Sequence, residues 1–269
     1  MRFTLANPLA ERAKRVIEFA QPLADEIDFY APDRRARGGW VITQTGDHRP
    51  FATRPVEHRH FVFPIELEPY ATQTYFVRIA GTPSVPSSPT LWIESAHRAA
   101  SQSANLWLGL TFGVIAAMLL YNALIGTALR ERLFLWYVAF AASYGFYHLA
   151  LSGLAFQWLY PLHPRFGDFA VTLSLCASIV FAAQFSRSFL STHTLFPSLD
   201  RALSMLMMIA VVLGVTSAVA ADRSIVWIGQ ITALAAACVA VIGGLRAWRS
   251  GYRPARFYSA ASATVCAFG

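Results

Sequence analysis

The stretch Leu106–Ala128, LWLGLTFGVIAAMLLYNALIGTA, decides the class of fold. It carries no charged side chain and is long enough to cross about 30 Å of hydrocarbon as a helix, the conformation that satisfies its own backbone there. Four more apolar segments of similar length follow it: Leu133–Ser152, Phe169–Leu190, Ala202–Ala221 and Ile225–Arg246. A sixth segment begins after Arg256. We predict an all-α polytopic membrane helix bundle over residues 106–269, with five complete helices and part of a sixth, in place of a buried soluble core.

The composition agrees with a membrane protein. The 269 residues are 55% hydrophobic and 14% charged, whereas a soluble domain carries about 25% charged residues. The net charge of +7 is spread along the chain without a recognition motif, so we predict no nucleic-acid partner. All three cysteines, Cys176, Cys238 and Cys266, fall in apolar segments, which excludes a disulfide framework outside the membrane.

Residues 1–98 alternate polar and apolar side chains in short runs, the pattern of half-buried strands. Phe61, Phe63, Ile65 and Leu67 would share one face of a strand, and turn residues such as Gly38-Gly39 and Pro83-Ser84-Val85-Pro86 separate the runs. The expected strands are Arg2–Leu5, Arg15–Phe19, Glu26–Tyr30, Trp40–Thr43, His58–Leu67, Thr74–Ile79 and Thr90–Ile93. This indicates an incomplete β-sandwich of the jelly-roll type.

Both ends of the chain suggest a fragment. Met1 already opens a strand-like run with no secretory signal before it, and the segment after Arg256 stops short of a full span. We expect a chain truncated at both ends.

Arginine counting predicts the orientation in the membrane. The first, third and fifth breaks hold eight arginines: Arg130, Arg132, Arg187, Arg201, Arg246, Arg249, Arg253 and Arg256. The second and fourth breaks hold only Arg165 and Arg223. The arginine-rich side is cytoplasmic, which places the N-terminal domain in the periplasm of a bacterium and the bundle in its inner membrane.

Histidines and aromatic residues are the candidate ligand groups of the N-terminal domain. His48, His58 and His60 raise the question of a metal, because His58 and His60 would share one face of a strand. No cysteine and only Glu57 lies near them in the sequence, so the sequence predicts no metal and no cofactor. Tyr30, Trp40 and Tyr75 are candidates for stacking on a sugar, although packing in the core or at its rim is the more common role of such aromatic side chains.

Four polar side chains lie in the apolar segments, where such groups are costly and often functional: Asn122, His148, Gln184 and Gln230. Asn122 and Gln184 are expected at similar depth, where a hydrogen bond between them would join two helices. His148 would lie near the outer end of its segment and either titrates or reaches interfacial water. Known catalytic signatures such as G-x-S-x-G and H-E-x-x-H are absent from the sequence, so we predict no enzyme in this chain.

The chain resembles a known family in the order of its motifs. LWLGLTFGVIAAMLLYNAL, LFLWYVAFAASYGFYHLALSGLAFQWLYP, FAAQFSRSFL, FPSLDRAL and GYRPARFY follow one another after DFYAPD, GGWVITQTGD, RPVEHRHFVFPIEL and YFVRI. The chain is similar to bacterial seven-transmembrane receptors with diverse intracellular signalling modules, and its first hundred residues resemble that family's second type of extracellular domain. Within these motifs, Tyr121-Asn122, Gly153, Gln157, Pro161 and Gly251 to Phe257 fit the family pattern.

The resemblance implies a receptor. Its periplasmic sandwich would bind a small molecule, with a carbohydrate as one class, and its helices would signal to a cytoplasmic output domain such as a diguanylate cyclase or a histidine kinase. Its partners are then the lipid bilayer, the ligand and that output domain, with the oligomeric state left open and a homodimer as one option. A transporter with an accessory periplasmic domain is the alternative, although no internal repeat supports it.

Overall fold

The computed structural model describes residues 1–33, 36, 38–81, 88–217 and 223–250, without the side chains of 168 and 223. The chain forms two compact units. The first comprises Met1–Leu110 with Leu149–Gly167, and the second comprises Thr111–His148 with Asp168–Gly269. The predicted domain boundary between residues 98 and 106 falls inside one long helix, so this helix contributes to both units.

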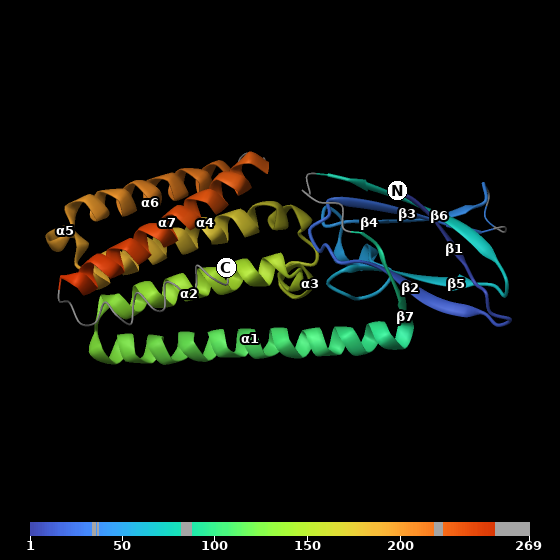
Figure 1. Cartoon of the computed structure of the whole chain (residues 1–269), viewed down its shortest axis with the longest axis horizontal. Helices are drawn as coiled ribbons and strands as arrows, with labels where there is room; N and C mark the ends of the chain where they lie inside the picture. Colours follow the sequence, from blue (N-terminus) through green and yellow to red (C-terminus); the bar gives the residue numbers. More distant parts are fainter. Residues whose placement is uncertain (34–35, 37, 82–87, 218–222, 251–269) are drawn as a thin grey trace. The chain divides into compact units, whose positions relative to one another are not determined.

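The first unit contains two antiparallel sheets (Figure 1). One sheet has the order β1-β6-β3-β4 and the other has the order β5-β2-β7. The strands are β1 (Arg2–Ala6), β2 (Ala13–Phe19), β3 (Glu26–Pro32), β4 (Trp40–Thr45), β5 (Phe61–Leu67), β6 (Thr72–Ala80) and β7 (Thr90–Ile93). All seven predicted strands are therefore present, and the sandwich is confirmed.

The core of the sandwich comes from the period-2 pattern read in the sequence. Phe61, Phe63, Ile65 and Leu67 are all buried in one cluster, and Tyr75 and Val77 join them from the other sheet. The rings of Phe29 and Phe63 stack across the two sheets at 4.4 Å between centroids. Burying such side chains from both inner faces is the main stabilising term of a sandwich.

One strand begins later than predicted. We expected His58–Leu67, but β5 begins at Phe61, which is paired with Phe19 at the end of β2. Before it the chain bends, with hydrogen bonds from Arg54 N to Phe51 O and from His58 N to Val56 O. The assumption that His58 and His60 share a strand face was therefore wrong. The predicted turn at residues 83–86 lies outside the described residues.

Five helices in the described part of the chain are long and apolar enough to span a membrane. They are α1 (Glu94–Leu129), α2 (Arg132–Leu151), α4 (Pro164–Phe189), α6 (Pro197–Ser217) and α7 (Arg223–Arg249). Two short helices, α3 (Leu154–Trp158) and α5 (Thr192–Leu195), were not predicted. The expected sixth segment, Cys266 and the motif from Gly251 to Phe257 lie outside the described residues.

The helix α1 begins earlier than the apolar pattern indicated. Its first turn starts at Glu94, directly after β7, whereas the apolar stretch begins at Leu106. The intervening segment is rich in alanine and carries an i,i+4 pair between Glu94 and Arg98, both of which favour a helix. At 1.5 Å per residue its 36 residues span about 54 Å, more than the hydrocarbon core requires.

The helices of the second unit pack through small and apolar side chains. Leu175 and Cys176 of α4 contact Ala210 and Leu213 of α6 in one buried cluster, which also includes Ala236 of α7. Figure 1 shows α4, α6 and α7 side by side. Apolar side chains also cover the outside of these helices, as lipid requires.

Candidate functional site

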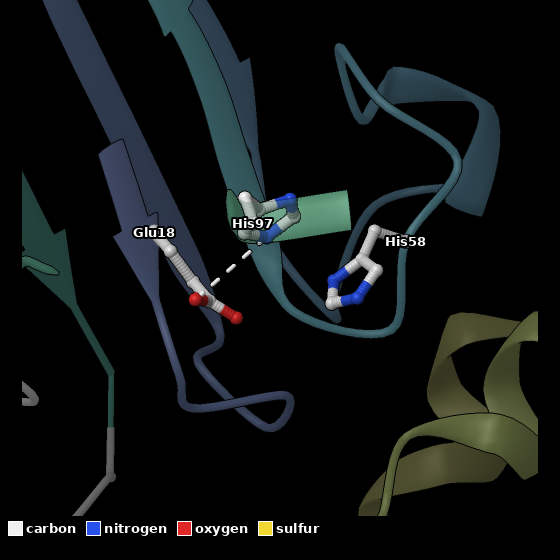
Figure 2. A group of neighbouring side chains, drawn as sticks. All are labelled: Glu18, His58 and His97. Carbon is white, nitrogen blue, oxygen red and sulfur yellow. Dashed lines mark ion pairs between the residues drawn. The ribbon is translucent and has the colours of Figure 1, made fainter. Parts of the chain in front are cut away.

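Four side chains from distant parts of the sequence meet on the outer face of the three-stranded sheet. We call them the histidine cluster: Glu18, His58, His60 and His97. Glu18 lies on β2, where its neighbours Ile17 and Phe19 point into the core, so the strand period turns its carboxylate outward. Figure 2 shows Glu18, His58 and His97 pointing toward one another from a strand, a loop and the first turn of α1.

Short distances hold the cluster together. His60 Nδ1 lies 2.7 Å from Glu18 Oε1, and His97 Nε2 lies 3.7 Å from Glu18 Oε2. The backbone N–H of His60 donates to His58 Nδ1 at 3.0 Å. The ring of His58 is 5.2 Å from that of His60 and 5.3 Å from that of His97. Three imidazoles therefore surround one carboxylate.

The electrostatics favour a carboxylate at Glu18 and a neutral ring at His58. The hydrogen bond from His60 lowers the pKa of Glu18, and attraction to the histidines adds to this, although burial works against it. Burial lowers the pKa of His58 to about 4, and repulsion by His60 and His97 contributes. A neutral imidazole with a free lone pair is the form that binds a metal ion.

Several buried polar atoms at this site have no hydrogen-bond partner within the described residues. They are Nε2 of His58, Nε2 of His97 and the indole Nε1 of Trp92, whose ring is 6.2 Å from that of His97. Unpartnered buried polar groups are rare in proteins, and each calls for an explanation such as local strain, a water molecule or a bound ion. The outer face of the three-stranded sheet therefore carries buried nitrogen atoms that have no hydrogen-bond partner among the described residues.

The sequence found only half of this cluster. His58 and His60 do come together, but His48 lies in a separate group with Asp25 and Asp47, where its side chain is exposed. His97 and Glu18 were missed because neither lies near His58 in the sequence.

The aromatic candidates for sugar binding divide into two kinds. Tyr75 is only 2% exposed, and its hydroxyl donates to Gln73 Oε1 at 2.7 Å, so Tyr75 is a core residue. Trp40 is 36% exposed and packs edge-on against the ring of Phe76 at 5.2 Å. Tyr30 is paired with Phe76 in the same sheet and lies on the same outer face. Tyr30 and Trp40 thus remain as candidates, and Tyr75 does not.

A buried arginine joins the sandwich to the segment that follows α2. Arg54 is 6% exposed, and its guanidinium lies over the rings of Phe61, Phe51 and Phe156 at 4.1, 4.8 and 5.5 Å. Its Nη1 donates to the carbonyl of His58 at 2.9 Å and to that of Arg59 at 2.5 Å. Burial lowers the pKa of Arg54 to about 10, so the side chain stays cationic at neutral pH.

Two residues that fit the family pattern make the same connection. Gly153 has φ 77°, and a Cβ there would lie 2.6 Å from Pro22 Cβ, so only glycine suits both the conformation and the space. The carbonyl of Pro161 accepts a hydrogen bond from the backbone N–H of Phe51 at 3.0 Å. The segment Leu149–Gly167 therefore belongs to the same compact unit as the sandwich.

Three of the four intramembrane polar side chains contact residues of their own helix, and the fourth joins two helices. Asn122 donates to the carbonyl of Met118 in its own helix at 2.8 Å, and Gln184 lies 3.5 Å from Nη1 of Arg187. Asn122 and Gln184 each have a contact within their own helix, and the hydrogen bond between them stays a prediction. Gln230 of α7 is hydrogen-bonded to Tyr147 of α2 and joins two helices. His148 packs against the ring of Tyr144 at 4.5 Å.

The connection between α4 and α6 is fixed by an ion pair that brings two family motifs together. Arg187 donates to Asp200 through Nε at 2.8 Å and Nη2 at 3.0 Å, in a bidentate geometry. The hydroxyl of Thr192 in α5 donates to the same carboxylate at 2.7 Å. This contact stabilises the helical hairpin.

A β-sandwich whose last strand continues into the first of several membrane-spanning helices defines a class: polytopic membrane proteins with an N-terminal domain outside the membrane. Residues 1–93 match the family described as 7TMR-DISM extracellular 2. Residues 104–269 match the family described as 7TM diverse intracellular signalling. The chain therefore belongs to the 7TMR-DISM family of membrane sensory receptors. No curated protein and no solved structure matched the chain.

Family membership shows that the chain belongs to a class of receptors, and the alternative of a transporter with an accessory domain is not supported. Both matched domains are of the sensory type, and neither is catalytic. The N-terminal sandwich is the extracellular domain, and the helices that follow contact the lipid bilayer.

Proposed function

We propose that this chain is the sensing and membrane part of a bacterial inner-membrane receptor. Its sandwich binds a ligand in the periplasm, and its helices pass the signal to a cytoplasmic output domain, such as a diguanylate cyclase or a histidine kinase, on the same polypeptide. The observation that carries this proposal is the direct passage from strand to helix: β7 ends at Ile93 and α1 begins at Glu94.

This junction supports a mechanical relay. β7 is hydrogen-bonded to the central strand β2 from Arg15↔Ile93 to Glu18↔Thr90. A shift of that sheet moves the first turn of α1, because no flexible linker absorbs the motion. A length of about 54 Å allows α1 to carry the displacement through the hydrocarbon core.

A second connection supports the same relay. Arg54 and Phe51 bind the segment between α2 and α4 through Phe156 and Pro161. The sandwich is therefore connected to α1 through β7, and it also contacts the segment that joins α2 to α4. A ligand that changes the loop before β5 would act on both connections.

The outer face of the four-stranded sheet supports a carbohydrate as ligand. Trp40, Phe76 and Tyr30 provide aromatic surface there, and sugars stack on such rings. Beside them, Asp28 accepts hydrogen bonds from Arg78 at 3.1 Å and Gln44 at 3.3 Å, which places polar groups next to the rings. Rings flanked by polar groups suit a sugar, which has apolar faces and hydroxyl edges.

Inserting two glycines between Ile93 and Glu94 tests the relay in the receptor with its output domain attached. Because glycine breaks the rigid joint, we expect normal membrane abundance and loss of the ligand-dependent change in output. The matched control inserts the same two glycines between Ser88 and Pro89, before β7, and should respond like the unmodified receptor. Full signalling by the first variant would contradict the relay.

A further inference from the structure

The histidine cluster has the composition and spacing of a metal site. One ligand atom each from Glu18, His58 and His97 lie within 4.8 Å of one another, and all three side chains are at least partly buried. They come from β2, from the loop before β5 and from the first turn of α1. Tertiary folding has thus brought two imidazoles and a carboxylate to one point.

An ion pair alone does not account for the geometry. Glu18 Oε1 is already used by His60 at 2.7 Å, while Oε2 faces His97 Nε2 at 3.7 Å, too far for a hydrogen bond. His97 Nε2 is buried and has no hydrogen-bond partner in the described part of the chain. Two ligand atoms bound tetrahedrally at 2.0–2.1 Å from one ion lie about 3.3–3.4 Å apart. The distance between Glu18 Oε2 and His97 Nε2 would therefore have to shorten only slightly.

The third ligand, His58, has its lone pair on Nδ1. Because Nδ1 accepts a hydrogen bond from the backbone N–H of His60, the neutral ring carries its proton on Nε2. If an ion binds to Nδ1, the hydrogen bond from the His60 amide is lost and a coordinate bond takes its place. The widest separations in the cluster, up to 4.8 Å, would have to shorten by about 1.4 Å for the three ligand atoms to share one ion.

The ligand types select the class of ion. Imidazole nitrogen suits zinc and its transition-metal neighbours, whereas Ca²⁺ and Mg²⁺ require oxygen ligands. Two histidines and one glutamate leave a coordination position open, as in accessible zinc sites. His60 holds the carboxylate through Oε1, the role that outer-shell partners play in metal sites.

We propose that Glu18, His58 and His97 bind one Zn²⁺ ion, with His60 as the partner that orients Glu18. The ion would join the three-stranded sheet directly to the first turn of α1, at the junction where β7 becomes the helix. Bound zinc would then change the signal that the receptor transmits. This consequence rests on the proposed function, whereas the binding of zinc does not.

Zinc binding is tested on the chelator-stripped 269-residue chain in detergent micelles, by titration of Zn²⁺ against a fluorescent chelator. We expect one saturable site per chain. Glu18→Gln and His97→Ala should weaken binding by more than about 100-fold, and His60→Ala by about 10-fold, as outer-shell changes do. The controls are His163→Ala, which removes an exposed histidine, and His48→Ala, which alters the group with Asp25 and Asp47.

Cobalt provides a second measurement that needs no variant. Co²⁺ in a four-coordinate site with nitrogen and oxygen ligands should give visible absorption bands that Zn²⁺ abolishes at one equivalent. The near-isosteric Glu18→Gln decides the outcome if an alanine variant fails to fold. Three results would each overturn the proposal: no saturable Zn²⁺ binding to the unmodified chain, unchanged affinity in Glu18→Gln, or loss of binding in His48→Ala with His97→Ala unaffected.

Discussion

Replacing Arg54 by methionine removes the cation that joins the sandwich to the segment after α2. The carbonyls of His58 and Arg59 lose their donor, at about 1–3 kcal/mol for each buried acceptor. The lost cation–π contacts add about 2 kcal/mol for a desolvated site. One contribution has the opposite sign. Burial lowers the pKa of Arg54 from 12.5 to about 10, which corresponds to a cost of about 3 kcal/mol for burying the charge, and methionine removes this cost. Together these contributions lead us to expect that Arg54→Met lowers the free energy of unfolding of the first unit by roughly 3 kcal/mol, within about 1–5 kcal/mol.

The part of this change that depends on Phe156 is isolated by a double-mutant cycle. Phe156→Leu keeps the apolar contact in α3 but removes the ring, which is 4% exposed and 5.5 Å from the guanidinium. A cation–π pair in a buried setting is worth about 1–2 kcal/mol, so we expect a coupling energy of about 1 kcal/mol. This coupling measures how firmly the sandwich holds the segment between α2 and α4.

Hydrogen exchange is the assay, because it reports the free energy of local opening. The amide of Phe51, which donates to the carbonyl of Pro161 at 3.0 Å, lies at the contact itself. Its protection is followed by mass spectrometry for the unmodified chain, both single variants and the double variant in micelles. Pairing Arg54→Met with Phe29→Leu in the sandwich core is the control, and should be additive within about 0.5 kcal/mol. A cycle with Phe156 that is equally additive would refute the reasoning.

Four further outcomes follow from the same geometry. Gly153→Ala should destabilise the first unit by about 2–4 kcal/mol, since αL strain adds to a clash with a proline ring, and the melting temperature measures it; unchanged melting would contradict the fit. Asp200→Asn should destabilise the α4–α6 hairpin by about 1–2 kcal/mol, and resistance to denaturant in micelles measures this change. The expected value is below that of a fully buried ion pair because the side chain of Arg187 is partly exposed. Arg54→Lys should become pH-sensitive. The burial that lowers the arginine pKa would also lower that of a lysine below its usual value of about 10.4, so stability falls as pH drops below that value, while the unmodified chain shows no such loss near neutral pH. Reporter fusions should place Arg130 in the cytoplasm and Leu162 in the periplasm; the reverse would overturn the arginine count.

The periodicity of apolar side chains predicted most of the fold, because the two environments of this chain impose simple patterns. Phe61, Phe63, Ile65 and Leu67 alternate as a half-buried strand must, and lipid requires uninterrupted apolar helices such as α6. The same method missed the first turns of α1. The segment from Glu94 to Asn105 is polar, and its helical structure comes from local propensity and from the strand that precedes it.

The sequence by itself therefore determined the class of protein, a β-sandwich followed by membrane helices. Only the tertiary structure decided which side chains meet. Glu18, His58 and His97 lie on three elements whose contact depends on sheet pairing and on the direction in which α1 leaves β7. Tyr75 was assigned to the core for the same reason, since the inward face of β6 is defined by the sheet opposite it. Local patterns fix which face of a strand or helix is apolar, but the neighbours of each side chain depend on long-range packing.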